Sequence, residues 1–517
     1  MRHYEVALFL ICLILLGIGI GWGLPETSPR SLPVSWATDE LAPSGLLQEI
    51  MNSLVKRSGF YNPQYPLFGY LVAAVPAIPY YVSVAGLGSE RLQDLPVARV
   101  IGLLARGMTV LMAAGTVVIA CRTSTVLWGS SWAWIAGLLT MLYPPMYYYG
   151  RTSNVDVPAL FWTAIGLWQF VVALRTGFTN RTAWILSISA ALAMSTKDTS
   201  YGALVPVAVI LVWREWANNR RLILKSLAIF IATYALASGA VLNPDRYLQH
   251  LSFIRHGSTR HFGFHYGSQL PYSEVLLRSV RETADNMGWM VLMLAVLGLV
   301  LCWVRQRRWL IWVLPAVGII IFTILPARFV LYRFTITAGY VLIFFASFAL
   351  IRIIEWNRTA GLVLTAGVVG WTLLVDADFT WQMWHDSRYE AGVWLARNAR
   401  SEDRIGHYGV DEGGKLPFTD RRITLVDGPL SLPEPNGPEF LISFPHQNYE
   451  RDREHKLPQG AFEALLEGRA GYVQMFAVQA PALFHVKPGR FVNPPVRIFV
   501  RQDRVAELTD RVPRIGI

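Results

Sequence analysis

Long apolar runs separated by short polar loops fill the chain from residue 4 to residue 376. Each run is close to the ~20 residues that an α-helix needs to cross a bilayer. The pattern predicts a mostly α fold, a polytopic membrane helical bundle of about 11 transmembrane helices. The predicted helices are 4–24, 98–120, 131–149, 154–174, 182–196, 200–213, 222–242, 285–304, 309–326, 329–350 and 359–376.

One further apolar run, residues 66–88, interrupts this alternation. A full crossing there would reverse the orientation of every later loop, and Pro76 and Pro79 divide the run. Because an interior proline removes a helical hydrogen bond, we predict a re-entrant or interfacial segment. Apolar residues at helical spacing predict a second interfacial helix at 46–58. Residues 25–97 would then form one long outer loop.

The pattern changes after residue 376. A helix-like segment at 388–399 precedes short strand-like segments that are separated by Pro- and Gly-rich breaks. These segments are 404–408, 423–426, 439–444, 471–478 and 496–500. We therefore predict a transmembrane domain over 1–376 and a C-terminal soluble α/β domain over 377–517. The second domain carries no nucleophile elbow, phosphate loop or metal spacing, so covering the outer cavity, selecting the acceptor and simple stabilisation all stay open.

Composition and charge agree with a membrane protein. Of the 517 residues 53% are hydrophobic and 16% charged, whereas a soluble protein carries about a quarter charged residues. The net charge of +11 is concentrated in short loops such as 214–225 and 305–308. The positive-inside rule places these loops and the N-terminus in the cytoplasm, and the C-terminal domain on the outer side. This distribution argues against nucleic-acid binding.

The N-terminal run and the cysteines argue against a cleaved signal peptide and against a disulfide or zinc framework. Pro25-Glu26-Thr27 follows the first run in place of a small-residue cleavage site, so we predict an uncleaved helix. Cys12, Cys121 and Cys302 lie far apart in or beside apolar runs. Their spacing gives neither a disulfide framework nor a zinc site.

Polar and charged residues gather at the predicted outer ends of the helices. Asp39 and Glu40 are adjacent carboxylates just after the first helix. Ionisable groups at membrane depth are costly, so their convergence at one face predicts chemistry on a substrate that lives in the bilayer. The other candidates at this face are Tyr65, Arg99, Arg151, Asn154, Asp156, Lys197, His256, His261, Arg328 and Arg333.

Several of these residues form motifs whose order resembles the C-type glycosyltransferase (GT-C) superfamily. The chain is similar in particular to the dolichyl-phosphate-mannose protein mannosyltransferases and the lipid A aminoarabinose transferases, over about residues 1–400. The motifs are Asp39-Glu40, Tyr65-Pro66-Leu67-Phe68, the arginine-led helix Ala98 to Leu103, the turn from Arg151 to Asp156, the hairpin Ala193 to Lys197, and Arg333-Phe334.

The resemblance implies transfer of a sugar from a polyprenyl-phosphate donor to a glycan, lipid or protein acceptor. The reaction would take place at the outer face of the bacterial inner membrane, with inversion at the anomeric carbon. Asp39 would be the general base, with Glu40 and Asp156 completing the catalytic acids. Cationic side chains would bind the donor phosphate, and further polar residues would contact the acceptor or sugar. The first group is Lys197, Arg333, Arg328 and Arg99; the second is Arg151, Asn154, Tyr65, His256 and His261.

Two features bear on the details of this reaction. Aminoarabinose transferases carry a lysine before a Pro-Pro-Leu segment, whereas this chain has Asn62-Pro63-Gln64-Tyr65-Pro66, which argues against that particular sugar. No metal is expected, although His256 and His261 could ligate one if their segment were helical, and glycines there favour a loop. A divalent ion (Mg or Mn) bridging Asp39 and Asp156 is the alternative that the oligosaccharyltransferase branch suggests.

Structural explanations exist for each motif. Asp39 and Glu40 could be solvated loop acids, Arg151 and Asp156 an ion pair across a turn, and Lys197 the end of a helix. A transporter or lipid flippase, a surface-polysaccharide polymerase or ligase, and a membrane scaffold are the alternative functions. A transporter would predict inverted repeats, and none is visible in the sequence.

Overall fold

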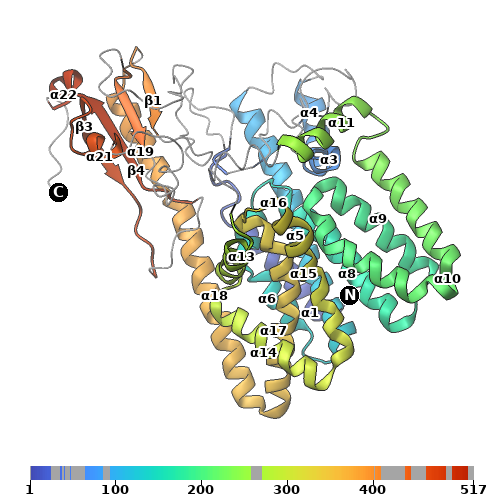
Figure 1. Cartoon of the computed structure of the whole chain (residues 1–517). Helices are drawn as coiled ribbons and strands as arrows, with labels where there is room; N and C mark the ends of the chain where they lie inside the picture. The colour runs from blue at the N-terminus through green and yellow to red at the C-terminus, as the bar shows by residue number, and fades with distance from the viewer. Residues whose placement is uncertain are drawn as a thin grey trace.

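A helical bundle with a small sheet at one side makes up the computed structural model of this chain (Figure 1). The structure describes residues 2–24, 35–37, 40, 47, 50, 65–85, 94–257, 270–400, 402–408, 437–443, 461–484 and 492–509. Most described residues before residue 400 are helical, as the apolar pattern predicts.

The first half of the bundle is built around α5, a 34-residue helix over Leu95–Trp128. Asp94 precedes it and Gly129, with a φ of +65°, ends it in the left-handed conformation that favours glycine. The other helices here are α1 (His3–Gly17), α3 (Leu67–Ala74), η2 (Val75–Ala77), α4 (Ile78–Ala85), α6 (Trp134–Met141), α7 (Pro144–Tyr149), α8 (Asp156–Thr176), α9 (Asn180–Thr196), η4 (Asp198–Ser200) and α10 (Tyr201–Ala237).

The second half begins beyond α10 and contains a sharp bend. Helices α13 (Tyr272–Met287) and α14 (Trp289–Arg305) meet at 109°, with Gly288 between them at a positive φ. The other helices are α11 (Pro244–Ser252), η5 (Phe253–Gly257), η6 (Arg307–Val313), α15 (Leu314–Gly318), η7 (Ile319–Ile324), α16 (Leu325–Ala327), η8 (Tyr332–Thr335), α17 (Ile336–Trp356) and α18 (Arg358–Trp384).

The predicted helices and the observed ones agree in type more than in bounds. Within the described residues, six helices are long and apolar enough to cross a membrane, or seven if the bent α13–α14 pair is one span. The count of about 11 therefore stays a prediction. The backbone leaves helical conformation at Asn219, inside the basic loop predicted between 213 and 222. One of the six is Leu67–Val84, the segment that we expected to be re-entrant or interfacial, and Pro76 lies in η2, which divides it. Its re-entrant or interfacial form stays a prediction.

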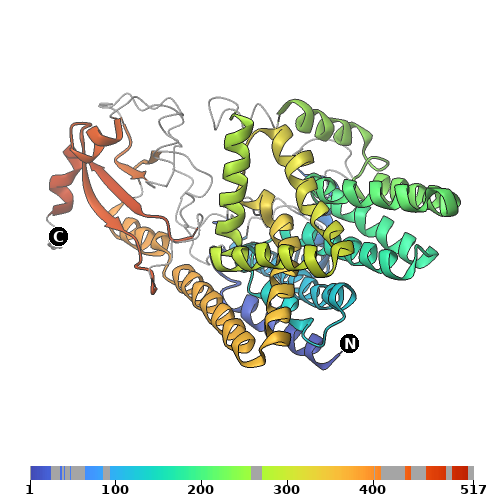
Figure 2. The ribbon, with the colours of Figure 1, turned by 60° about the horizontal axis from the view of Figure 1, so that its bottom comes forward.

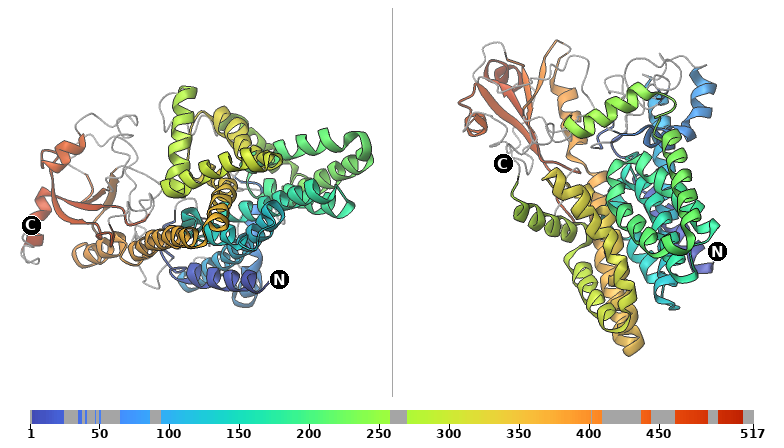
Figure 3. Two further views of the ribbon diagram at one scale, coloured as in Figure 1. Left: turned by 90° about the horizontal axis from the view of Figure 1, so that it is seen from below. Right: turned by 45° about the vertical axis from the view of Figure 1, so that its right-hand side comes forward.

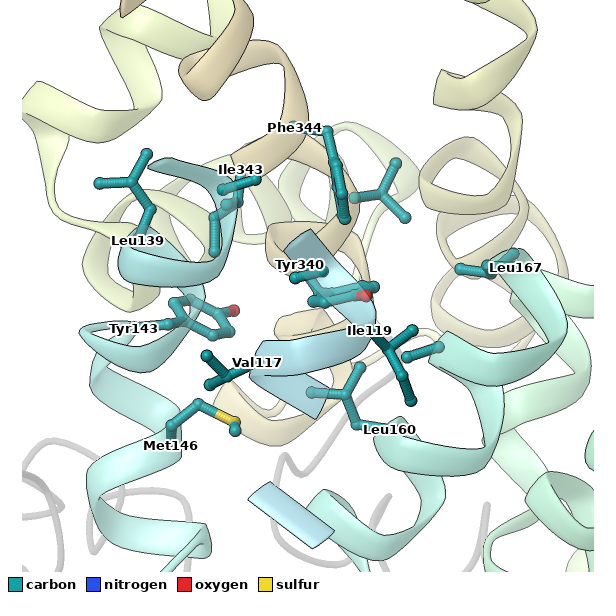
Figure 4. Packing of buried hydrophobic residues seen from close by; sticks show 14 of the residues in the cluster. Val117, Ile119, Leu139, Tyr143, Met146, Leu160, Leu167, Tyr340, Ile343 and Phe344 are labelled. Carbon is teal, nitrogen blue, oxygen red and sulfur yellow. The ribbon is translucent and has the colours of Figure 1, made fainter. Parts of the chain in front are cut away.

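A large core of aliphatic and aromatic side chains holds α5, α6, α8 and α17 together (Figure 4). Val117 of α5, Leu139 of α6, Leu160 of α8 and Phe344 of α17 are all buried in it. The hydroxyl of Tyr143 donates to the Ile336 carbonyl at 3.2 Å, which satisfies a polar group at the centre of this packing.

Beyond the bundle, α18 leads to a four-stranded sheet that stands to one side (Figures 2 and 3). The strand order is β1-β2-β4-β3, with β1 and β2 parallel and the other pairs antiparallel. These strands are β1 (Ile405–Tyr408), β2 (Phe440–Ser443), β3 (Tyr472–Val478) and β4 (Val496–Arg501), and the helices beside them are α19 (Ser387–Asn398), α21 (Ala461–Leu466) and α22 (Gln502–Thr509).

Four of the five predicted strands are confirmed, and 423–426 lies outside the described residues. Helix α18 continues through residues 376 and 377 without a break, so the predicted domain boundary falls inside a helix. Inward-facing Phe440, Ile442, Ile498 and Val500 bury one face of the sheet against α19.

Candidate functional site

Glu40 lies at the centre of a fully buried polar cluster. Its carboxylate accepts hydrogen bonds from Arg106 Nε at 2.7 Å and Nη2 at 2.6 Å, from Ser153 N at 2.7 Å and Oγ at 2.9 Å, and from the Ser35 hydroxyl. Neither side chain of the Glu40–Arg106 pair is exposed. Burial alone would raise the pKa of Glu40, but the Arg106 charge and these hydrogen bonds outweigh it and lower the pKa below its usual value. Glu40 is therefore not a solvated loop acid.

Arg106 is a site residue that the sequence analysis missed. It lies inside α5, and its Nη1 also donates to the carbonyl oxygens of Ile20 and Trp22, both at 2.6 Å. The guanidinium thus joins the end of the first helix to Glu40. An arginine within an apolar helix is itself a signal, because burying an unpaired charge is costly. Arg106 lies about three turns inside the apolar run, away from the helix ends where the other candidate residues gather.

Asp39, the predicted general base, lies outside the described residues. The structure describes Ser35 to Ala37 before it and Glu40 after it. Glu40 N donates to the Ala37 carbonyl at 3.2 Å, and Ala37 N donates to Ser35 Oγ at 3.1 Å. Its role as base stays a prediction.

The second cluster joins Asp156 to Lys197. Asp156 is the first residue of α8, where a carboxylate is favoured by the helix dipole, and Lys197 follows the last residue of α9. Their side chains form an ion pair, with 2% and 8% of the side chain exposed respectively. Asp156 is thus paired with Lys197 and not with Arg151, which was the structural explanation considered above.

Two acceptor atoms near this pair are buried without a hydrogen-bond partner among the described residues. They are Asp156 Oδ2 and Asn154 Oδ1. The Asn154 amide donates to Thr152 Oγ1 at 2.8 Å, which fixes the orientation of the side chain. Buried acceptors of this kind are normally satisfied, so the turn before α8 offers two oxygens to a ligand that carries donors.

Helix α3 connects this turn to the late arginine. A Cβ on Gly69 would lie 2.9 Å from the Thr196 carbonyl oxygen, so only glycine allows α3 to approach the end of α9 this closely. Just before α3, the Tyr65 hydroxyl accepts from Arg333 Nη1 at 3.2 Å. The Lys197 ammonium lies 5.7 Å from the centre of the Phe334 ring. The Tyr65–Arg333 and Asp156–Lys197 pairs are therefore linked through Phe334, which adjoins Arg333 in sequence. They lie at the end of the bundle where α3 and α11 are found (Figure 1).

Arg151 occupies a different environment. It is buried and donates to Thr380 Oγ1 at 2.8 Å and to the Leu15 carbonyl at 2.8 Å, and its guanidinium lies over the Tyr147 ring. Burial lowers the pKa of Arg151 to about 10, so it is still charged at neutral pH. These contacts fasten the turn before α8 to α1 and α18, and its predicted contact with acceptor or sugar remains untested.

The remaining cations lie around the same end. The Arg328 guanidinium is 4.5 Å from the centre of the Tyr272 ring, and its backbone has a φ of +54°. Arg99 lies beside Gly21: a Cβ atom added to Gly21 would be 3.8 Å from Arg99 Nη2. Their role as reserve phosphate ligands stays a prediction.

The two predicted histidines fall largely outside the described residues. His256 belongs to η5, but its side chain and the whole of His261 lie outside the described residues. Within the ranges that are described, no three His, Cys, Asp or Glu side chains converge to hold a metal ion. The divalent-ion alternative would involve Asp39, which lies beyond those ranges.

The helical bundle and the small sheet together form a fold that solved structures share. No protein-family model and no curated protein sequence matches the chain. ArnT from Cupriavidus metallidurans bound to undecaprenyl phosphate superposes with a TM-score of 0.51 and 14% identity, over 96% of this chain and 98% of that one. AglB, the Archaeoglobus fulgidus oligosaccharyltransferase in complex with an inhibitory peptide and a dolichol-phosphate, superposes with a TM-score of 0.50 and 10% identity. That match covers 97% of this chain and 88% of AglB.

A further Archaeoglobus fulgidus oligosaccharyltransferase structure, a complex with Zn and sulfate, gives a TM-score of 0.46 and 12% identity. That match covers 79% of this chain, which spans only 60% of the length of that protein. The chain has the fold of the C-type (GT-C) membrane glycosyltransferases. The fold that the order of the motifs predicted is therefore confirmed.

Proposed function

We propose that this protein is a membrane glycosyltransferase that moves a sugar from a polyprenyl-phosphate donor to an acceptor at the outer face of a bacterial inner membrane. The observation that carries the proposal is the contact network linking Tyr65, Arg333, Phe334, Lys197 and Asp156. Segments far apart in sequence supply these residues, and no structural need of a helical bundle explains why acids and cations should meet there.

The donor phosphate would bind the cations of this network. A lysine ammonium carries three N–H donors, so Lys197 can contact Asp156 and a phosphate oxygen at the same time. Arg333 offers a planar guanidinium, which suits phosphate geometry. ArnT and AglB were solved with undecaprenyl phosphate and dolichol-phosphate, which supports a lipid-linked donor.

Asp39 would act on the acceptor. Its carboxylate would take the proton of the attacking hydroxyl, the hydroxyl oxygen would bond to the anomeric carbon, and the bond from that carbon to the phosphate oxygen would break. The phosphate leaves with an additional negative charge, which Lys197 and Arg333 would stabilise. A single displacement of this kind inverts the anomeric centre. Glu40 would hold the base in place, since its own oxygens are engaged by Arg106 and Ser153.

A transfer assay with separate binding measurements tests the proposal. Purified protein would be supplied with a panel of radiolabelled polyprenyl-phosphate sugars and a membrane extract. We expect Asp39→Asn to abolish transfer and to leave donor binding nearly unchanged. Lys197→Ala and Arg333→Ala should each weaken donor binding ~10-fold or more, as expected for a charge-assisted hydrogen bond.

Arg181→Ala is the matched control, because Arg181 is exposed near the other end of α9 and should bind donor normally. The protein transferring no sugar from any donor would refute the proposal. Unchanged donor affinity in both cation variants would refute the phosphate assignment alone.

A further inference from the structure

A fully buried arginine, Arg388, connects the segment after α18 to the loop that precedes Asp39. Its side chain and that of Asp386 are both completely excluded from solvent. The two form a bidentate pair, with Nε 2.8 Å from Oδ1 and Nη2 2.7 Å from Oδ2. A buried arginine needs this compensation, because an unpaired charge is strongly disfavoured where water is excluded.

Two tryptophans of the N-terminal loop enclose this guanidinium. It lies 5.4 Å from the centre of the Trp22 ring and 4.8 Å from that of Trp36. Trp22 Nε1 donates to Asp386 Oδ2 at 3.2 Å, and the Trp36 ring packs against Tyr389 with centres 4.5 Å apart. Cation–π contacts are strongest when desolvated, as here. Trp22 and Trp36 thus pack directly against residues 386–389.

Trp36 stands only three positions before Asp39, and its neighbours reach Glu40. Trp36 N donates to the Gly23 carbonyl at 2.9 Å, Ser35 hydrogen-bonds Glu40, and Arg106 Nη2 donates to Ser35 Oγ at 3.0 Å. A displacement of Trp36 would therefore also move Ser35. Because Ser35 is hydrogen-bonded to both Glu40 and Arg106, the displacement would reach the Glu40 carboxylate.

We propose that Arg388 is a positioning residue for glycosyl transfer, which holds the Asp39–Glu40 segment in place through Trp22 and Trp36. The inference rests on the proposed function of the site and assigns the C-terminal part a task beyond covering the cavity. A misplacement of about 1 Å in a catalytic group can cost ~100-fold in rate. The contacts of Arg388 described above lead to Asp386, Trp22 and Trp36 and, through Trp36, toward Glu40, so turnover should suffer and donor affinity should not.

Kinetics of Arg388→Ala test this. We expect kcat to fall ~100-fold with less than about a 3-fold change in donor affinity, and Arg388→Lys, which keeps the charge but not the planar bidentate contact, to lie between. Arg504→Ala is the control: it removes an arginine whose Nη2 donates to both carboxylate oxygens of Asp403, at 2.8 and 3.1 Å, elsewhere in the C-terminal part. It should keep the wild-type kcat.

Gly23 provides a second test that keeps Arg388 intact. It has a φ of +63°, and a Cβ there would lie 2.8 Å from Trp36 Cβ. Gly23→Ala should therefore displace Trp36 and lower kcat. Gly129→Ala imposes the same backbone strain at a φ of +65° where a Cβ meets nothing within 4 Å, so it isolates the contact from the strain.

Hydrogen exchange of residues 35–40 separates this inference from the proposed function. Faster exchange there in Arg388→Ala and Gly23→Ala, together with lower kcat, supports the positioning role. Wild-type kcat in both variants, or a fall in kcat without faster exchange, overturns it while the glycosyltransferase assignment stands. If the unmodified protein transfers no sugar, the proposed function fails, and exchange at 35–40 still decides whether Arg388 holds the loop.

Discussion

At the scale of single residues, Glu40 and Arg106 carry opposite charges in a place where neither touches solvent. Removing both charges from water costs several kcal/mol per ion, and their contact repays this only because Ser153 and Ser35 satisfy the other lone pairs. The pair is therefore better explained as a device for fixing the loop that carries Asp39 than as a source of stability.

This explanation predicts how the two residues respond to mutation. Glu40→Gln should destabilise the protein by about 3–5 kcal/mol, because it leaves the Arg106 charge buried without its counter-ion. The double variant Glu40→Gln/Arg106→Met should recover most of that loss. Chemical denaturation in detergent measures both. A double variant less stable than the single one would mean that the pair contributes strongly to stability.

The same pair predicts a pH dependence. The pKa of Glu40 is lowered in the folded protein from its ordinary 4.5, so the unfolded chain binds its proton first as pH falls. The contribution of Glu40 is complete above about pH 4.5 and is lost as pH falls through the folded pKa. Melting curves that extend from pH 7 to well below pH 4.5 should show the wild type losing its stability advantage over Glu40→Gln at the acid end. An advantage that grows on acidification would contradict the pairing.

At the scale of elements, the short helix α3 sets the position of Lys197. It approaches the last turn of α9 so closely that Gly69 faces the Thr196 carbonyl, one residue before Lys197, and also Val155, one residue before Asp156. The re-entrant or interfacial segment predicted at 66–88 therefore packs on the two turns that carry the acid–cation pair.

Gly69→Ala tests this packing. The added methyl group would push α3 from α9, at a cost of about 1–3 kcal/mol for overpacking, and should weaken donor binding several-fold. Gly367→Ala on α18 is the control, because a Cβ there meets nothing within 4 Å and alanine favours a helix. Donor binding that is normal in both variants would show that α3 does not position Lys197.

Apolar runs and their breaks predicted α8 and four strands to within two residues, because burial in lipid or in a core imposes a periodic pattern. They also predicted α5 and α17, but the predicted ends differ from the observed ones by up to eight residues. The partners inside the site could not be predicted. The sequence does not indicate that Arg106 meets Glu40, or that Asp156 chooses Lys197 over Arg151, since each contact depends on how distant helices are packed. The bend between α13 and α14 lies at Gly288, which has a φ of +76°, and the apolar pattern does not indicate it.

At the scale of the whole molecule, α18 connects the bundle to the sheet, and both the sheet and α3 lie toward the same end (Figures 1 and 3). The positive-inside rule predicts that this end faces outward and that the loop 305–308 faces the cytoplasm. The acceptor would then be met outside the cytoplasm.

Cysteine labelling tests this orientation, because the three native cysteines are buried. Arg307 and Gln502 are exposed near opposite ends of the predicted topology. We expect an impermeant maleimide to label Gln502→Cys in intact spheroplasts and Arg307→Cys only after permeabilisation. Labelling of both from the same side would refute the predicted topology.

The central claim is that Lys197 and Arg333 bind the phosphate of a polyprenyl lipid beside Asp156. The most direct measurement is an experimental structure of the protein with undecaprenyl phosphate bound in a lipid nanodisc. The account predicts phosphate oxygens within about 4 Å of both the Lys197 ammonium and the Arg333 guanidinium, the range of a direct ion pair. A phosphate bound elsewhere, with the Lys197–Asp156 pair untouched by ligand, would contradict it.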